Sequence, residues 1–225
     1  MSTYNIIAET DEATVVAEYT PESRVASAYQ SEAELERDFI LRLEAQGYDY
    51  LDVKDEAALV ANLRAQLERL NGIRFSESEW KRFFDGVIAP ANKGVLDKTR
   101  LIQEDSVQAF ARDGGETANV MLIDKRRIHN NSLQVINQYE EHGGRRETRY
   151  DVTILVNGLP LVHVELKRRG VALREAFNQI ARYGRESFWG GAGLYDYVQI
   201  FVISNGTHTK YYSNTTRALH AGEAG

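Results

Sequence analysis

The sequence predicts an α/β fold in which a mixed central β-sheet is flanked by helices. Residues 31–84 carry three segments with helical periodicity, and residues 119–167 carry four segments with strand patterns. A further helical segment at 171–188 precedes a nearly continuous apolar strand at 197–204. Helices followed by strands, with one strand–helix–strand unit, are typical of a mixed sheet covered by helices.

The N-terminal helical portion, at about residues 30–115, is defined by capping signals and apolar stripes. A capping box that begins at Ser31 opens the first helix. Leucines spaced by three or four residues define a second helix over residues 56–72. Another capping box, beginning at Ser76, opens a short helix that runs to residue 84.

The sheet portion is expected at about residues 118–216. Its predicted strands are 119–124, 132–140, 148–156, 161–167, 197–204 and an edge strand at 209–214. No internal repeat, low-complexity tract or Pro-rich linker separates the two portions. Residues 1–225 therefore read as a single domain.

The composition excludes several classes of protein. No apolar run reaches the roughly 18 residues of a membrane span, and the N-terminus lacks the pattern of a signal peptide. The absence of cysteine excludes disulfides and thiolate metal sites and fits a reducing cytosol. We therefore expect a cytoplasmic protein with no membrane partner. The five histidines show no zinc-ligand spacing, and His163, two residues before Glu165, is expected to pack or hydrogen-bond on the same strand face.

The charge is unevenly distributed along the chain. The net charge is −6, but residues 145–185 hold nine Lys or Arg against four Asp or Glu. A local basic patch attracts polyanions even on an acidic protein. A solvated charged face explains the same pattern, so charge alone does not decide between them.

Three Asp/Glu-x-Lys triplets occur in the chain: Asp52-Val53-Lys54, Glu79-Trp80-Lys81 and Glu165-Leu166-Lys167. Residues two apart on a strand point to the same face, whereas on a helix they diverge by about 200°. Only the third triplet lies on a strand that has an acid-bearing strand next to it. Glu165 and Lys167 are therefore the preferred pair.

The register of the hairpin at 148–167 decides whether Asp151 meets Glu165. If Val156 pairs with Pro160 around a three-residue loop, Asp151 lies opposite Glu165. A two-residue Gly-Leu loop would instead place the two carboxylates on opposite faces. The Asn-Gly sequence at 157–158 permits the first register.

In that register two carboxylates and an ammonium group meet at one end of the sheet. Adjacent carboxylates repel each other unless a proton or a hard cation neutralises them. Oxygen ligands suit Mg²⁺, which completes its shell with water and substrate phosphate and lowers the pKa of a bound water. Lys167 would orient that water and offset charge in the transition state. The group predicts phosphodiester hydrolysis, and an exposed salt-bridge ladder is the alternative.

The predicted helix at 171–188 adds polar side chains near this end of the sheet. Gln179 and Tyr183 are four residues apart and so share a helix face. Four arginines lie close by in the sequence: Arg168, Arg169, Arg174 and Arg182. Side chains of these types contact phosphate backbones and displaced bases, although an ordinary helix surface is also consistent with them.

Together these residues resemble the PD-(D/E)XK nuclease superfamily. Asp151, the triplet at 165–167 and the Q-x-x-x-Y element at 179–183 match its motif order. More closely, "YDVTILVNGLPLVHVELKRRGVALREAFNQIARY" resembles the N-terminal nuclease region of the R subunit (HsdR) of type I restriction–modification enzymes. The resemblance covers most of residues 5–216. Tyr150 stands where the superfamily name has proline.

The resemblance implies a restriction-endonuclease-like core. Asp151 and Glu165 would be Mg²⁺ ligands, and Lys167 would be the catalytic lysine. Gln179 and Tyr183 would support DNA contact or domain coupling. Glu36, on the first predicted helix, matches an additional acid found in some members.

The resemblance also implies the setting of the reaction. The substrate would be double-stranded DNA, and the partners would be methyltransferase and specificity subunits. ATP would serve only motor domains that translocate DNA, and these are not expected in this chain because it has no G-x-x-x-x-G-K-[ST] loop.

Other functions stay open at this point. A stand-alone restriction or repair nuclease of the same superfamily would need its own recognition surface. A non-cleaving module that couples DNA to the motor would not require all of Asp151, Glu165 and Lys167. A glycosidase would leave the lysine without a role.

Overall fold

The computed structural model describes residues 3–10, 13–20, 30–141, 148–173 and 193–214. The strands are β1 (Thr3–Thr10), β2 (Ala13–Thr20), β3 (Asp49–Tyr50), β4 (Val107–Ala111), β5 (Thr117–Met121), β6 (Leu133–Glu141), β7 (Thr148–Val156), β8 (Leu159–Leu166), β9 (Ile200–Ser204) and β10 (Thr209–Ser213). The helices are α1 (Glu32–Glu44), α2 (Glu56–Asn71), α3 (Glu77–Phe83) and α4 (Val95–Gln103), with short turns η1 (Phe84–Ile88), η2 (Ile128–Asn130) and η3 (Leu194–Tyr197). Within the described ranges, no helix has both the length and the apolar character that crossing a bilayer requires.

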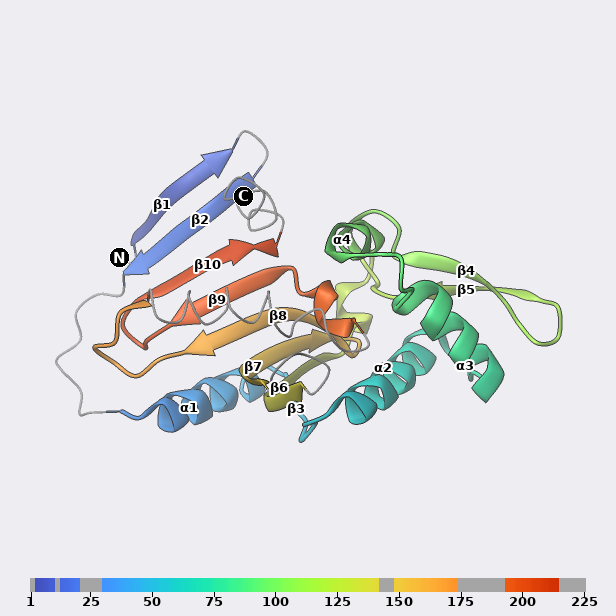
Figure 1. Ribbon diagram of the computed structural model, residues 1–225, viewed down its shortest axis with the longest axis horizontal. Helices are drawn as coiled ribbons and strands as arrows, with labels where there is room; N and C mark the ends of the chain where they lie inside the picture. The colour runs from blue at the N-terminus through green and yellow to red at the C-terminus, as the bar shows by residue number, and fades with distance from the viewer. Residues whose placement is uncertain (1–2, 11–12, 21–29, 142–147, 174–192, 215–225) are drawn as a thin grey trace.

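The central sheet has eight strands in the order β1-β2-β10-β9-β8-β7-β6-β3. The β8–β9 and β3–β6 pairs are parallel, and the other neighbours are antiparallel. Figure 1 shows α1 running along the sheet and the β1–β2 hairpin forming one edge. The predicted mixed sheet flanked by helices is confirmed.

The helix α1 covers one face of the sheet with its apolar stripe. Ser31 and Glu34 form the predicted capping box at its start. Ile40 and Leu43 pack in one buried cluster with four sheet residues, which are Val135, Val152, Val164 and Leu166. Val152 belongs to β7, and Val164 and Leu166 belong to β8, so α1 packs across the two strands that bear the charged residues.

A second, larger core joins the sheet to a helical unit at one end of it (Figure 1). The leucines predicted to define α2 are fully buried, namely Leu59, Leu63 and Leu67. An aromatic cluster of Phe75, Trp80, Phe83 and Phe110 connects α3 to the separate β4–β5 hairpin. These contacts fix the helical unit against the sheet.

Some elements were not predicted. The β1–β2 hairpin and β4 had no counterpart among the expected strands, and α4 had none among the expected helices. The helix α4 begins at Val95, and its N-cap residue Gly94 has no side chain to cap it, so the usual Ser, Thr, Asp or Asn start signal is absent. The predicted helix at 171–188 falls almost entirely outside the described residues.

The turn between β7 and β8 differs from the expected three-residue loop. Val156 pairs with Leu159 rather than Pro160. The two residues between them, Asn157 and Gly158, have φ of 51° and 81°. An Asn-Gly pair with both φ positive is the favoured two-residue hairpin turn, because its twist matches that of the strands.

A bulge in β8 then restores the predicted register toward the charged end. Leu155 pairs with Pro160, but Ile154 pairs with Val162, so Leu161 is an extra residue in β8. Beyond the bulge the pairing is the predicted one, with Thr153 opposite His163. The expected register is therefore right at this end, and the expected loop is wrong.

Candidate active site

Three charged side chains meet where β7 begins and β8 ends. The β7–β8 register, continued by one residue, sets Asp151 opposite Glu165. Asp151 Oδ2 accepts a hydrogen bond of 2.8 Å from the backbone N–H of Leu166. Lys167 Nζ donates to Glu165 Oε1 at 2.9 Å. The structure thus brings together the three residues that were predicted to form the site.

The burial of this group differs from that of a surface ion pair. The Glu165 side chain is fully buried, the Lys167 side chain is 12% exposed and Asp151 is half-buried. Lys167 Nζ also donates to the carbonyl oxygen of Leu166 at 3.1 Å. An exposed salt-bridge ladder would leave the side chains of its members in water, so this arrangement disagrees with that alternative.

The charges within the group shift each other's protonation. Burial raises the pKa of Asp151 to about 7, and the charge of Glu165 acts in the same direction. The N–H of Leu166 and the charge of Lys167 oppose this rise. Burial alone would lower the pKa of Lys167, but the charge and hydrogen bond of Glu165 raise it overall. The group therefore behaves as one coupled set of charges.

The oxygen atoms of the two carboxylates fit a hard cation. Glu165 Oε2 is buried and accepts no hydrogen bond from the described residues, and His163 Nε2 lies 3.6 Å from it. A buried acceptor without a donor calls for a counterpart such as a cation. No cluster of three or more acidic or histidine side chains capable of holding a metal occurs among the described residues. Two carboxylates with water and substrate oxygen suit Mg²⁺, which keeps several waters.

Glu36 lies on α1, close enough for its charge to contribute to the raised pKa of Asp151, where burial is the main cause. It is 9% exposed. Its two oxygens accept hydrogen bonds of 2.5 Å from the side-chain amides of Asn137 and Gln138. The predicted additional acid is therefore near the carboxylate pair, and within the described residues it is held by two amides of β6.

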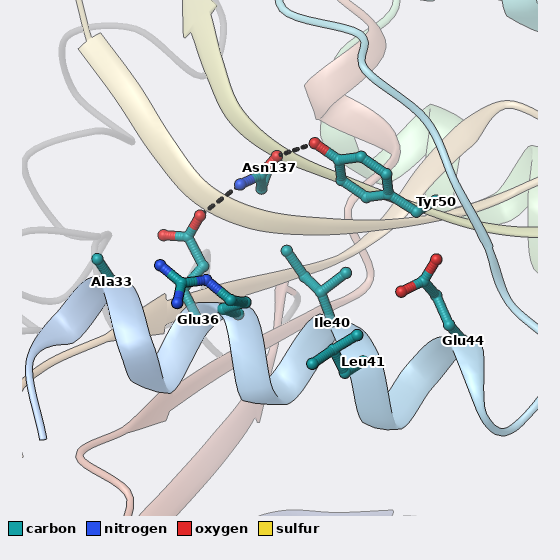
Figure 2. Close-up of a pocket in the computed structure, with 8 residues that line it drawn as sticks. Ala33, Glu36, Ile40, Leu41, Glu44, Tyr50 and Asn137 are labelled. Carbon is teal, nitrogen blue, oxygen red and sulfur yellow. Dashed lines mark hydrogen bonds between the residues drawn. The ribbon is translucent and has the colours of Figure 1, made fainter.

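A groove of about 370 Å³ opens beside Glu36, between α1 and the β3–β6 edge. Figure 2 shows Asn137 at its centre, joined to Glu36 on one side and to Tyr50 on the other. Asn137 Oδ1 accepts from Tyr50 Oη and Lys54 Nζ, both at 2.9 Å. Lys54, from a triplet that was not predicted to form the site, thus supports Glu36 through the Asn137 amide.

Gln138 has φ of 52°, a left-handed conformation that is uncommon for a residue other than glycine. It lies between the Asn137–Val152 and Tyr139–Tyr150 pairs, so it is opposite Asp151. Neither Gln138 nor Asn137 was predicted as a site residue. No local sequence signal identifies them, because their partner Glu36 lies about 100 positions away.

The predicted basic residues are only partly described. Arg168 and Arg169 are exposed directly after Lys167, and the backbone N–H of Arg168 donates to Glu32 Oε1 at 3.2 Å. Four predicted site residues lie outside the described residues, namely Arg174, Gln179, Arg182 and Tyr183.

His163 is fully buried and shares the face of Glu165, as expected. Its ring packs edge-on against Tyr150 and Phe201, with centroids 5.4 Å and 6.3 Å apart. In the Glu79-Trp80-Lys81 triplet, Glu79 binds Arg112 while Lys81 binds Asp85, so its two charges point to different partners, as helical spacing predicts.

A mixed sheet whose adjacent strands carry two carboxylates and a lysine at one end defines a restriction-endonuclease-like α/β domain. The family model described as "Type I restriction enzyme R protein N terminus" matches residues 29–220, and the chain belongs to this family.

Named relatives agree with this assignment. The chain is 48% identical over 212 residues to the EcoprrI endonuclease subunit of Escherichia coli, covering 94% of this chain and 67% of that protein. It is 36% identical over 197 residues to the SsaAORF53P endonuclease subunit of Staphylococcus saprophyticus, covering 85% and 20%. It is 29% identical over 205 residues to the HindI endonuclease subunit of Haemophilus influenzae, covering 78% and 18%.

All three relatives are described as endonuclease subunits of type I restriction enzymes. The predicted family and the predicted enzyme class, a hydrolase of the endonuclease type, are therefore confirmed at this level. The chain spans about two thirds of the first relative and about a fifth of the others.

Proposed function

We propose that this chain is the Mg²⁺-dependent endonuclease domain of a type I restriction–modification enzyme and hydrolyses phosphodiester bonds of double-stranded DNA. The observation that carries the proposal is the convergence of Asp151 and Lys167 on the buried Glu165 at the end of the β7–β8 pair. Carboxylates that hold a cation, beside an ammonium group, suit a reaction in which negative charge develops on a phosphate.

In this proposal each residue has a separate role. Asp151 and Glu165 would hold Mg²⁺ through their carboxylate oxygens, among them Glu165 Oε2, which accepts no hydrogen bond from the described residues. Mg²⁺ supplies neutralising charge at the phosphate and lowers the pKa of a water molecule. Lys167, held by Glu165 and the Leu166 carbonyl, would orient the attacking water and offset charge on the phosphate. The exposed Arg168 and Arg169 would contact the DNA backbone.

We infer the setting of the reaction from the family to which the chain belongs. Cleavage would follow ATP-driven translocation of DNA by the motor domains of the full-length subunit. Methyltransferase and specificity subunits would complete the enzyme, and Gln179, Tyr183, Arg174 and Arg182 would add DNA contacts. The absence of cysteine supports a cytoplasmic location.

The test compares DNA cleavage by the assembled enzyme, supplied with ATP and Mg²⁺, for the wild type and for Asp151→Ala and Lys167→Ala. ATPase activity is followed in parallel. Lys81→Ala is the matched control, because this exposed lysine pairs with Asp85 on the surface of α3 and η1. We expect both site variants to lose cleavage and retain ATPase activity.

Two other outcomes lead to different functions. Normal cleavage by Asp151→Ala and Lys167→Ala would show that these residues do not form the active site. Loss of cleavage and ATPase activity together would favour a module that couples DNA to the motor. The Lys81→Ala enzyme should match the wild type in either case.

A further inference from the structure

A second groove, of about 550 Å³, opens at the same end of the sheet as Lys167. It lies between the loop that follows β8 and the turn that joins β9 to β10. The backbone N–H of Lys167 donates to the carbonyl oxygen of Ser204 at 2.8 Å, just before that turn. The groove is therefore next to the candidate active site in the fold.

Both walls of the groove are fixed by one buried side chain. Asn205 is 5% exposed, and its Nδ2 donates to the carbonyl oxygen of Val171 at 2.9 Å. Its Oδ1 accepts from the backbone N–H groups of Thr207 and His208 at 3.0 and 2.8 Å. Asn205 thus ties the loop to the turn, and the groove has a defined shape without a ligand.

The charge of this groove is suited to an anion. None of the eight described residues that line it is acidic, and Lys210 and His208 are among them. Arg169 lies beside the turn, with its Nε 3.4 Å from where a Cβ on Gly206 would be. By contrast, the groove in Figure 2 is lined by Glu36 and Glu44. On a chain of net charge −6, a groove whose described lining includes Lys210 and no acidic residue is a local site for anions.

We propose that this groove is a phosphate subsite that binds one backbone phosphate of the DNA strand beside the scissile bond, with Lys210 as its main contact. The inference rests on the proposed nuclease function, which places DNA at Lys167. Lys210 lies on β10, opposite Glu18 of β2 in register, and its side chain lines the groove. His208 and the exposed Thr207 would add hydrogen bonds to the same phosphate.

The test measures DNA binding by the intact protein without divalent cations, so that the bound strand is not cut. Fluorescence anisotropy gives the affinity for a labelled duplex over a range of salt concentrations. Loss of one phosphate contact reduces the slope of log affinity against log salt by about 0.9. We expect that reduction for Lys210→Gln.

Two variants serve as matched controls. Lys210→Arg keeps the charge and should keep the slope. Arg37→Gln removes one charge from the groove between α1 and the β3–β6 edge and should leave the slope unchanged, which separates a local contact from a general change in net charge.

A further variant covers the case in which Lys210→Gln does not fold. Thr207 is exposed in the turn, so Thr207→Asp should leave the melting temperature unchanged while its negative charge weakens DNA binding several-fold. The proposed phosphate subsite would be wrong if Lys210→Gln had the same salt slope as the wild type. It would also be wrong if Thr207→Asp bound DNA with wild-type affinity.

The subsite and the nuclease function fail in different ways. If Lys167→Ala abolishes cleavage but Lys210→Gln leaves the salt slope unchanged, only the phosphate subsite is wrong. If Lys167→Ala cleaves like the wild type, the nuclease assignment is wrong whatever the slope shows.

Discussion

The backbone N–H of Leu166 donates a 2.8 Å hydrogen bond to Asp151 Oδ2, so the strand that carries Glu165 also fixes the carboxylate of Asp151. Lys167 in turn engages Glu165 Oε1. Each carboxylate therefore has one oxygen held by the protein. Among the described residues, no hydrogen-bond donor occupies Glu165 Oε2. These two hydrogen bonds explain how the protein orders two neighbouring carboxylates in one site.

Glu165→Gln tests the cation-binding role directly. An amide keeps the shape of the side chain but removes the charge that a cation requires. We expect the affinity for Mn²⁺, used as a probe, to fall more than about tenfold in isothermal titration calorimetry. We also expect Mn²⁺ to raise the melting temperature of the wild type but not that of Glu165→Gln.

Asp52→Asn is the control for this prediction, because Asp52 is exposed and its near partner is Lys54. It should bind Mn²⁺ like the wild type. Equal binding by Glu165→Gln and the wild type would mean that Glu165 does not hold the cation.

Gln138→Ala tests whether the amides of β6 position Glu36. Gln138 adopts φ of 52° opposite Asp151 and donates to Glu36 Oε2. Without this donor the Glu36 carboxylate loses one of its two supports, and partners of this kind typically change metal affinity or activity by about 10 to 100-fold. We expect the Mg²⁺ concentration for half-maximal cleavage to rise by about tenfold.

Gln108→Ala is the matched control, because Gln108 also carries an amide but belongs to the separate β4–β5 hairpin. The prediction is wrong if the two glutamine variants need the same Mg²⁺ concentration. A change in maximal rate alone, with the Mg²⁺ midpoint unchanged, would also contradict it.

Gly158→Ala tests the turn that sets the register of the site. Gly158 has φ of 81°, and a Cβ there would lie 2.6 Å from the Cα of Leu63 in α2. Both the positive φ and the contact with backbone oppose a methyl group, so we expect a loss of about 2 kcal/mol or more in the free energy of unfolding. Urea denaturation measures this loss.

Gly114→Ala provides the comparison, because its Cβ would meet no atom within 4 Å and its φ is not in the left-handed region. It should change the free energy of unfolding by less than about 1 kcal/mol. Similar stabilities for the two alanine variants would show that the turn tolerates a side chain.

Lys98→Met tests a buried ion pair that joins α4 to η3. Lys98 Nζ lies 2.6 Å from Asp196 Oδ2, and their side chains are 3% and 10% exposed. Removing the lysine leaves a buried carboxylate without its partner, which typically costs about 3 to 5 kcal/mol. We expect a loss of that order in urea denaturation at about pH 8.

This loss should depend on pH with a definite sign. Burial raises the pKa of Asp196, and the hydrogen bond from Lys98 opposes the rise, so the variant should have a still higher pKa. A folded carboxyl with a raised pKa binds a proton before the unfolded chain does, so stability increases as pH falls through that pKa. The difference between wild type and Lys98→Met should therefore shrink at about pH 5, and a difference independent of pH would contradict this reading.

The sequence determined the features that depend on neighbouring residues. The capping boxes at Ser31 and Ser76 form as predicted, and the leucines that define α2 are buried. Glu165 and Lys167 share a strand face because alternate residues on a strand point the same way. Each of these signals spans only a few positions, so it can be predicted from the sequence without the tertiary structure.

Only the tertiary structure decided how the strands meet. The two-residue turn at Asn157 and Gly158 and the bulge at Leu161 together produce the predicted pairing of the strands, although the sequence predicted neither of them. The support of Glu36 by Asn137 and Gln138 joins residues about 100 positions apart. Contacts of this kind depend on how α1 packs on the sheet, and that packing is a property of the whole core rather than of any local pattern.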